Sequence, residues 1–262
     1  MSETVAVRPI EINSLPEASA EERMAVYCNQ TLEALLPDAE YQLVAERLLR
    51  RYPKEVYHQP AHGLDVMHTT DWLLEQTGLE ELRDEHTRRA LLMAAVAHDA
   101  GLYSAEAARY ETNERYAAGL LWNEAGFVMD SDQLTKATRG ILGTIMDAQK
   151  QRRDTPEALL LHHADVGYIW SCDEAQFTQY ALRFRHEECK HLSWPDFQEL
   201  EAKFLDAYAI NLERDMRVLR LPEGVIQAMV VRVRHNQQYI THPDLEEPVL
   251  EDEWPSAARM LQ

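Results

Sequence analysis

Several features that large classes of proteins depend on are scarce or missing in this chain. Its 262 residues include only 3 cysteines, 9 glycines and 11 prolines. The odd number and wide spacing of Cys28, Cys172 and Cys189 argue against a disulfide framework and favour a reducing compartment. No apolar run approaches the roughly 20 residues that span a bilayer. The first residues also lack the basic and apolar regions of a secretory signal. We therefore expect a cytoplasmic protein.

Positive charge is also in short supply. The chain has 26 Lys and Arg against 45 Asp and Glu, which gives a formal net charge of −19. Nucleic acids and anionic membranes are bound through clustered positive charge, so we expect neither a nucleic-acid surface nor a membrane partner. A small anionic substrate is still compatible with this charge, because a bound divalent cation can dominate the local field.

Runs with the alternating pattern of strands are absent, whereas apolar residues recur at helical spacing almost throughout. The pattern predicts an all-α fold, a single helical domain of about ten helices over residues 20–240. A flexible arm at 1–19 precedes this domain, and an acidic, irregular tail at 241–262 follows it. The predicted helices lie at about 20–36, 38–52, 60–77, 81–100, 112–125, 130–150, 156–170, 173–190, 195–219 and 222–240.

Histidine and aspartate concentrate in three stretches, YHQPAHGLDV, LLMAAVAHDAG and LLLHHADVGYIW. A single histidine on a buried helix is more often a hydrogen-bonded core residue than a ligand. Asp99 and Asp165, however, each follow an apolar run, where an unpaired carboxylate is costly. Two such carboxylates on different helices, each beside a histidine, predict a shared cation inside the bundle.

A set of imidazoles and carboxylates suits first-row divalent metals such as Mn²⁺, Fe²⁺ or Zn²⁺, and Mg²⁺ less well. Four protein ligands leave positions of an octahedral shell open for water and for a phosphate oxygen. A cation held in this way lowers the pKa of water and neutralises phosphate charge. The residues alone therefore predict a metal site whose open positions are compatible with water and phosphate chemistry, which fits a net acidic protein.

The order His62, His98-Asp99, Asp165 resembles the HD superfamily of metal-dependent phosphohydrolases. YHQPAHGLDV resembles a Tyr-His-x-x-x-His-x-x-Asp-Val stretch shared by many members, including the cyclic-nucleotide phosphodiesterases, and HHADVGYIW resembles their His-x-Ala-Asp segment. ARYETNERYAAGLL and FTQYALRFRHEE resemble an Asn-Glu helix and a Tyr-Ala-x-x-x-Arg-x-Glu pattern in a bacterial group of predicted HD phosphohydrolases. The resemblance covers about residues 30–210 and implies an HD-type helical bundle and a chemistry, but no physiological substrate.

The resemblance also implies roles for particular residues. The implied ligands of one or two divalent ions (Mn, Fe, Zn, Ni, Co or Mg) are His62, His98, Asp99 and Asp165. Asp99 would bridge two ions if a second one binds. His58 matches the histidine that protonates the leaving oxygen. Its spacing of four residues from His62 would place both on the same side of one helical turn.

Further residues are predicted around this set. Asp65 orients His62, or else is a surface partner of its own helix. Asn113 and Glu114 hold metal-bound water, with Glu114 in a catalytic role, or else they form a solvated helix face. Arg115 takes up phosphate charge. His163 is a supporting residue near the metal or a core residue.

The sequence departs from the resembled families in two respects. Leu102 stands where the phosphodiesterases have a further histidine, and their purine-gripping Gln-aromatic segment has no clear match. Residues 100–161 contain no histidine, which disfavours a six-ligand di-iron oxygenase of this fold. These departures leave the substrate open.

The predicted function is metal-dependent hydrolysis of a small phosphoester, with a nucleotide as the favoured class, by a metal-activated water and with His58 as the proton donor. Two alternatives stay open: a cyclic or linear nucleotide phosphodiesterase, and a catalytically inactive HD bundle used as a ligand-binding or interaction module. The intact ligand set argues against the inactive module. The oligomeric state, including a homodimer, is also left open.

Overall fold

The structure is a computed structural model that describes residues 19–147, 149–150, 153–251 and 254. This part of the chain holds twelve α-helices, one 3-10 helix and no strand, which confirms the predicted all-α class. The arm predicted at 1–19 lies outside the described residues, except for Ser19, which caps the first helix. None of the described helices is long and apolar enough to cross a membrane.

The elements in chain order are α1 (Ala20–Leu35), α2 (Ala39–Leu49), α3 (Pro60–Gln76), α4 (Glu80–Arg83), α5 (Glu85–Ala97), η2 (Ala107–Arg109), α6 (Asn113–Ala125), α7 (Ser131–Gly143), α8 (Pro156–Asp165), α9 (Tyr168–Ser171), α10 (Glu174–Glu188), α11 (Trp194–Val218) and α12 (Glu223–Ile240).

Two predicted helices are each divided in the structure, so about ten predicted helices correspond to twelve in the described residues. The helix expected at 81–100 breaks at Asp84, whose side chain accepts a hydrogen bond from the backbone N–H of Thr87 and so caps α5. The helix expected at 156–170 breaks at Gly167. A Cβ atom on Gly167 would lie 2.7 Å from the Cγ2 of Thr69, so the close approach of α3 accounts for the glycine there.

The helix expected at 130–150 ends early, at Gly143. Arg153 explains this end, because its Nε donates to the carbonyl of Gly143 at 3.1 Å and its Nη2 to that of Ile145 at 3.2 Å. Gly143 ends the helix and Ile145 follows it, and among the described residues no later backbone N–H pairs with either carbonyl, so the guanidinium satisfies them instead.

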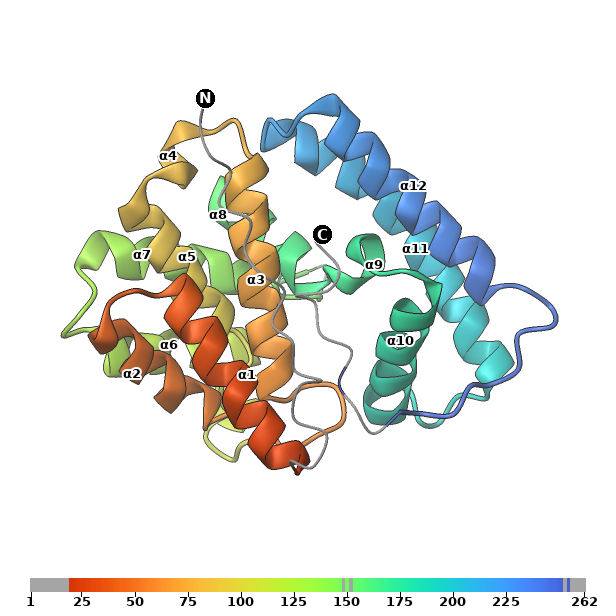
Figure 1. The fold of residues 1–262 in the computed structure, drawn as a ribbon, viewed down its shortest axis with the longest axis horizontal. Coiled ribbons are helices and arrows are strands. Elements are labelled where there is room, and N and C mark those ends of the chain that lie inside the picture. Colours follow the sequence, from red (N-terminus) through yellow and green to blue (C-terminus); the bar gives the residue numbers. More distant parts are fainter. Residues whose placement is uncertain (1–18, 148, 151–152, 252–253, 255–262) are drawn as a thin grey trace.

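Helix α5 is the centre of the bundle (Figure 1). Every residue from Ala90 to Ala97 is fully buried, and α5 contacts α2, α3, α4, α6, α7 and α8. A helix that is apolar on all sides belongs in a core. The packing of α5 therefore places whatever follows its last turn, His98 and Asp99, inside the protein.

The C-terminal third forms a second group of helices beside this core. In Figure 1, α11 and α12 pack side by side as an antiparallel pair, and α9 and α10 lie between that pair and α3. The described residues beyond Ile240 form no helix. Three of their side chains nevertheless pack against the hydrophobic core, those of Leu245, Leu250 and Trp254.

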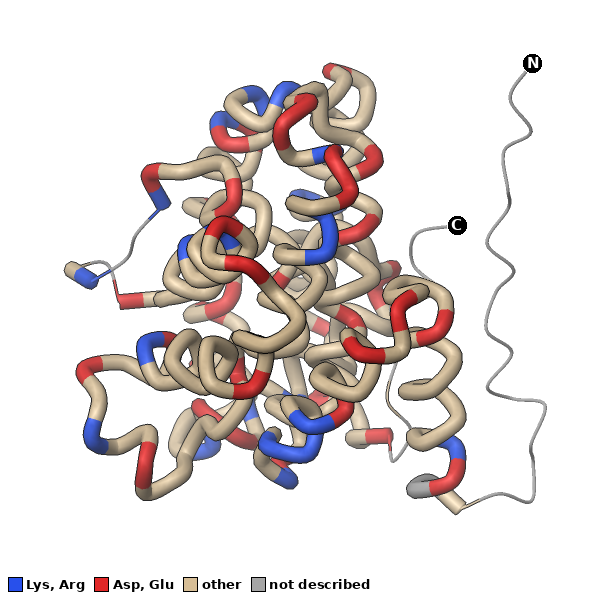
Figure 2. Tube along the Cα trace, turned by 90° about the vertical axis from the view of Figure 1, so that its left-hand side faces the viewer, with Lys and Arg blue, Asp and Glu red and all other residues tan. Residues whose placement is uncertain are grey.

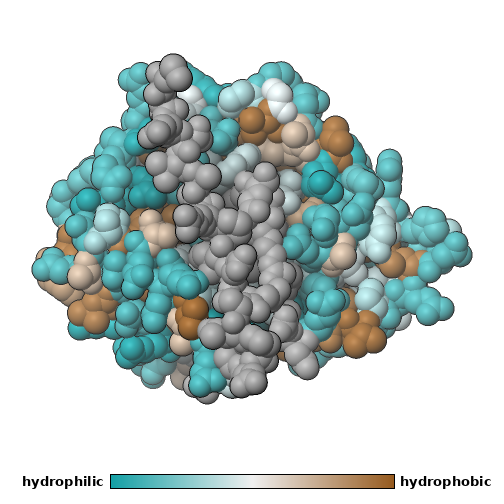
Figure 3. Space-filling view, in the orientation of Figure 1, coloured by the Kyte–Doolittle hydropathy of each residue, from teal (hydrophilic) through white to brown (hydrophobic). Residues whose placement is uncertain are grey.

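The surface is strongly polar. Figure 2 shows Lys and Arg interspersed with Asp and Glu along the helices. The face in Figure 3 is mostly hydrophilic, and its hydrophobic side chains stand in separate spots.

Candidate metal centre

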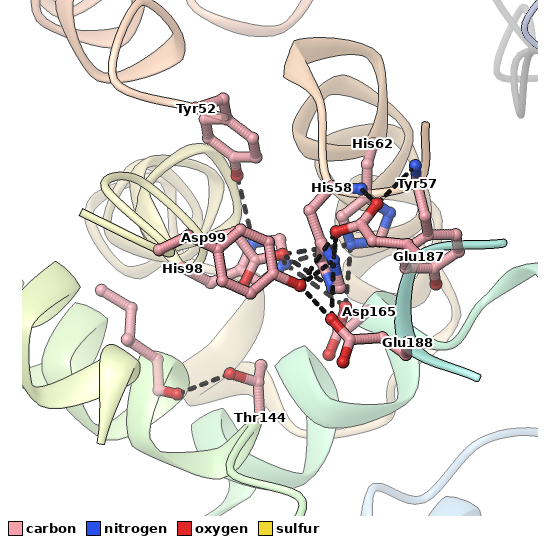
Figure 4. Close-up of polar contacts among 12 residues, drawn as sticks. Tyr52, Tyr57, His58, His62, His98, Asp99, Thr144, Asp165, Glu187 and Glu188 are labelled. Carbon is pink, nitrogen blue, oxygen red and sulfur yellow. Dashed lines mark hydrogen bonds and ion pairs between the residues drawn. The ribbon is translucent and has the colours of Figure 1, made fainter. Parts of the chain in front are cut away.

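Three helices bring the four predicted ligands together (Figure 4). His62 lies in the first turn of α3, which begins at Pro60. His98 and Asp99 directly follow the buried α5, and Asp165 is the last residue of α8. Because α3, α5 and α8 all pack against one another, the ends of three helices point their side chains into one place.

The donor atoms of this cluster are spaced as ligands on a single ion would be. His98 Nε2 lies 3.3 Å from His62 Nε2, 3.0 Å from Asp99 Oδ2 and 3.3 Å from Asp165 Oδ1. His62 Nε2 lies 3.1 Å from Asp165 Oδ1 and 3.5 Å from Asp99 Oδ2. Ligands about 2.1 Å from one cation are about 3.0 Å apart at octahedral angles and about 3.4 Å at tetrahedral ones. The donor set therefore fits a divalent cation.

The second nitrogen of His98 is fixed by the backbone. Its Nδ1 lies 2.7 Å from the carbonyl oxygen of Ala95, which can only accept a hydrogen bond. Nδ1 is therefore the protonated nitrogen of the neutral ring, and Nε2 keeps a lone pair directed at the cluster. This is the arrangement that metal-bound histidines generally need.

Without a bound cation, the charged forms of His98, Asp99 and Asp165 stabilise one another. Burial disfavours charge on Asp99 and Asp165, yet His98 holds the pKa of both carboxyl groups below its ordinary value. Burial also disfavours charge on His98, but Asp99 leads the neighbours that raise its pKa well above the ordinary value. A cation would replace these protons, so binding would release protons.

His58 lies outside α3, so the prediction that one helical turn aligns it with His62 is wrong. Pro60 begins the helix two residues later, and His58 reaches the cluster from the preceding connection. Its ring is nevertheless 5.9 Å from that of His62, and its Nε2 is 3.9 Å from Asp99 Oδ2.

Glu187, at the end of α10, holds His58 in place. Its Oε1 lies 2.6 Å from His58 Nδ1, and its Oε2 accepts the backbone N–H groups of Tyr57 at 2.8 Å and His58 at 3.1 Å. Burial disfavours a charged His58, but Asp99 and Glu187 together raise its pKa. The geometry directs Nε2 of His58 toward the metal site, while Nδ1 donates to Glu187.

Glu188 and Tyr103 extend this pair toward solvent. The hydroxyl of Tyr103 donates to Glu187 Oε1 at 2.9 Å and also contacts Glu188. Tyr103 has a φ of 62°, which is rare for a bulky residue and turns its ring over the pair. Our sequence prediction did not include these three residues. The Tyr-Ala-x-x-x-Arg-x-Glu pattern in FTQYALRFRHEE ends on Glu187 and was a usable signal, whereas nothing marked Tyr103.

Asp65 is tied to aromatic residues. Its carboxylate accepts hydrogen bonds from Tyr27 at 2.7 Å, from Trp254 Nε1 at 2.5 Å and from Tyr180. The predicted role of Asp65, orienting His62, stays a prediction.

Asn113 and Glu114 begin α6 near the cluster. Burial raises the pKa of Glu114, and the charges of Asp99 and Asp165 raise it further. The side-chain oxygen and nitrogen of Asn113 are buried and make no hydrogen bond within the described structure. The charges of Asp99 and Asp165 thus act on Glu114, and the predicted roles of Asn113 and Glu114 stay predictions.

Two other predicted residues occupy ordinary structural positions. Arg115 is partly exposed and pairs with Glu111 at 3.2 Å. His163 is fully buried, and its ring nitrogens meet the hydroxyl of Tyr208 at 2.9 Å and Asp215 Oδ2 at 3.2 Å. Of the two roles considered for His163, these contacts favour the core residue.

Comparison with known proteins connects this geometry to a family. Residues 57–141 match the family model of the 3′5′-cyclic nucleotide phosphodiesterases, and this third of the chain includes His58, His62, His98 and Asp99. No curated protein matches the sequence.

Solved structures share the fold. The phosphodiesterase domain of the rhodopsin phosphodiesterase of Salpingoeca rosetta superposes with a TM-score of 0.61 at 18% identity, over 86% of this chain and 88% of that one. A second structure, the phosphodiesterase domain of the RhoPDE fusion protein of the same choanoflagellate, gives 0.64 at 17% identity, over 86% and 91%. At such low identity the likeness shows a common fold.

Proposed function

We propose that this chain is a divalent-metal-dependent phosphodiesterase that hydrolyses a phosphodiester of a nucleotide, cyclic or linear. The observation that carries the proposal is the cluster of four donors at single-ion spacing, with the hydrogen-bonded His58–Glu187 pair beside it. Hydrolysis of any small phosphoester was the first prediction. The match of residues 57–141 to a cyclic-nucleotide phosphodiesterase model favours the diester among these substrates.

The chain's own residues supply acid catalysis and positioning. A divalent cation held by the cluster would stabilise negative charge on phosphate oxygens and lower the pKa of the attacking water. His58 gives the proton on Nε2 to the leaving oxygen, because that nitrogen faces the cluster. Glu187 accepts from Nδ1, which orients the ring and favours its protonated form by raising its pKa.

A cavity whose wall includes Tyr103, a neighbour of the His58–Glu187 pair, offers space for a substrate. This cavity of about 290 Å³ lies between the connection after α5 and the start of α6, with Tyr103 and Asn113 in its wall. Tyr103 also contacts Glu187, so one side chain links the cavity to the acid pair. A phosphodiester seated between the cavity and the cluster would have its leaving oxygen near His58.

The test compares metal content and turnover in three proteins purified without chelator: wild type, Asp99→Ala and the surface control Asp132→Ala. Each is analysed for bound metal and assayed in Mn²⁺ on a monoester (p-nitrophenyl phosphate) and on diesters (cyclic AMP, cyclic GMP and a linear dinucleotide). We expect at least one ion per chain and diester turnover in wild type and the control, with both lost in Asp99→Ala.

Three results would contradict the proposal. Full turnover in Asp99→Ala would show that the cluster takes no part in catalysis. Turnover of monoesters alone would return the chain to the broader phosphohydrolase prediction. Bound metal without hydrolysis of any tested ester would favour the inactive binding module.

A further inference from the structure

The last described segment of the chain, residues 245–251 with Trp254, is called the strap here. It crosses α10 and is held there through its backbone. The side-chain amide of Gln179 donates to the carbonyl of Val249 at 3.0 Å and accepts the N–H of Glu251 at 2.9 Å. Trp194 Nε1 donates to the carbonyl of Leu245 at 3.2 Å. Because the Gln179 amide pairs with one carbonyl and one N–H of the strap, it fixes the position of the strap backbone along α10.

Trp254 packs against buried polar side chains of α3 and α10, those of Asp65 and Arg183. Its Nε1 donates to Asp65 at 2.5 Å, and its ring lies 5.1 Å from the guanidinium carbon of Arg183 and 5.3 Å from the ring of Tyr180. Asp65 and Arg183 are only 5% and 4% exposed. An indole bound at this depth is part of the core packing of both helices.

One side chain connects Trp254 to two of the three histidines of the site, His58 and His62. The ring of Tyr57 lies 6.4 Å from that of Trp254, 4.8 Å from that of His58 and 4.9 Å from that of His62. Tyr57 is itself buried. Its ring also packs edge-on against that of Phe184, 5.5 Å away, so it has little freedom to absorb a change on the strap side.

We propose that the strap is a working part of the metal centre. Trp254 acts as a positioning residue: it sets the place of Tyr57 and of the α3 turn that carries Asp65, and through them the places of His58 and His62. This inference rests on the proposed function and extends it to a segment far beyond residues 57–141, where the family match lies. Coupling between two sites is reciprocal, so a cation bound at the cluster should also tighten the strap.

The test measures Mn²⁺ affinity of the full chain by competition with a chromogenic chelator, without substrate. The variants are Trp254→Ala, Trp254→Phe and Gln179→Ala, and the control is Trp122→Phe. Trp122 also donates from its indole, to Thr138, but on the exposed face of α6. Loss of a supporting contact around a metal site weakens binding by roughly tenfold or more. We expect that loss in Trp254→Ala, a smaller one in Trp254→Phe, which keeps a ring, and no change in the control.

Gln179→Ala removes two of the hydrogen bonds that hold the strap without altering Trp254, so it should also weaken Mn²⁺ binding. Hydrogen exchange supplies the reciprocal measurement: Mn²⁺ should slow exchange at residues 245–251 in wild type, and less so in Gln179→Ala. A residue that only stabilises the fold would not make the strap respond to the cation.

The outcomes separate this inference from the proposed function. If folded Trp254→Ala and Gln179→Ala bind Mn²⁺ as wild type does, the strap proposal is overturned while the metal centre stands. Unchanged strap exchange on adding Mn²⁺ to a wild type that binds it also overturns the strap proposal, even if Trp254→Ala fails to fold. If wild type binds no Mn²⁺, the proposed function itself is lost, and the strap proposal with it.

Discussion

Glu187 holds His58 through its ring and its backbone, and it contacts none of the four predicted ligands in the described structure. Its loss should therefore separate acid catalysis from metal binding. We expect Glu187→Gln to keep its metal but to lose roughly tenfold to a hundredfold in kcat on a cyclic nucleotide, because general acids contribute factors of that order or larger. The measurement compares that substrate with bis(p-nitrophenyl) phosphate, whose leaving group needs little protonation. Glu187→Gln should cleave this second substrate almost as fast as wild type does.

Glu188→Gln is the matched control for this prediction. Glu188 is the adjacent carboxylate and contacts Tyr103, but it holds neither backbone N–H of the His58 segment. Equal losses on both substrates in Glu187→Gln would show that Glu187 acts on something other than the proton of His58.

Glu201, on α11, is a buried carboxyl group without a catalytic role. It is 4% exposed, and burial raises its pKa to about 7. Because this pKa lies above the ordinary value of 4.5, the folded protein holds a proton that the unfolded chain releases between these values. The contribution of Glu201 to stability is thus fully present below pH 4.5 and is lost as the pH rises through 7.

We therefore expect Glu201→Gln to match wild type in stability at pH 5 and to exceed it at pH 9, by up to about 3 kcal/mol. Urea unfolding at both pH values measures this difference. Glu199→Gln, on an exposed part of the same helix, should show no such pH dependence. A Glu201→Gln protein that is no more stable than wild type at pH 9 would show that Glu201 finds a partner in the folded state.

At the scale of elements, the crossing of α7 and α8 determines where Asp165 lies. A Cβ atom on Gly143 would lie 2.3 Å from the carbonyl oxygen of Ala158, which is backbone and cannot turn away. We expect Gly143→Ala to cost about 1–3 kcal/mol of stability and to weaken Mn²⁺ binding, because the displaced helix ends in Asp165. Urea unfolding and the chelator competition measure the two effects.

Gly119→Ala is the opposite case on a neighbouring helix. Nothing lies within 4 Å of a Cβ at Gly119, inside α6, so alanine should stabilise the protein by about 0.5–1 kcal/mol. Similar effects of the two substitutions would mean that the α7–α8 contact is looser than the structure shows.

The sequence predicted helices well where local chemistry decides. Pro60 and Pro156 begin α3 and α8 where the prediction placed these helices, because proline fixes the first turn by itself. The glycine at the break, Gly167, accommodates Thr69, a residue of another helix, and no local pattern reports such a contact. The end of α7 similarly depends on a side chain ten residues later, Arg153.

The same distinction applies to the site. The histidines and aspartates of the cluster occur in short motifs, so their identities could be predicted, and the structure brings all four together. Glu187 and Trp254 lie 129 and 189 residues from their partners His58 and Asp65. The motif in FTQYALRFRHEE marks Glu187 as a residue, but only the packing of α10 and the strap against α3 shows which partners Glu187 and Trp254 contact.

For the molecule as a whole, the metal centre joins the ends of helices that come from distant parts of the chain. α3, α5 and α8 each contribute to it, and α10 reaches it through Glu187. With a net charge of −19, the protein also attracts cations in general. A useful test must therefore distinguish binding at the centre from loose association with the acidic surface.

Metal-linked stability makes that distinction. A ligand that binds only the folded state at 100 times its Kd stabilises it by about 2.7 kcal/mol, which for a chain of this size corresponds to roughly 5–10 °C in Tm. We expect Mn²⁺ to raise the Tm of wild type by this amount and EDTA to reverse it. Asp165→Asn removes one ligand of the cluster and should show little of the shift. Asp132→Asn changes the charge of the chain equally, but at the exposed start of α7, and should keep it. A rise of the same size in both variants would place the stabilising cation on the acidic surface rather than between α3, α5 and α8.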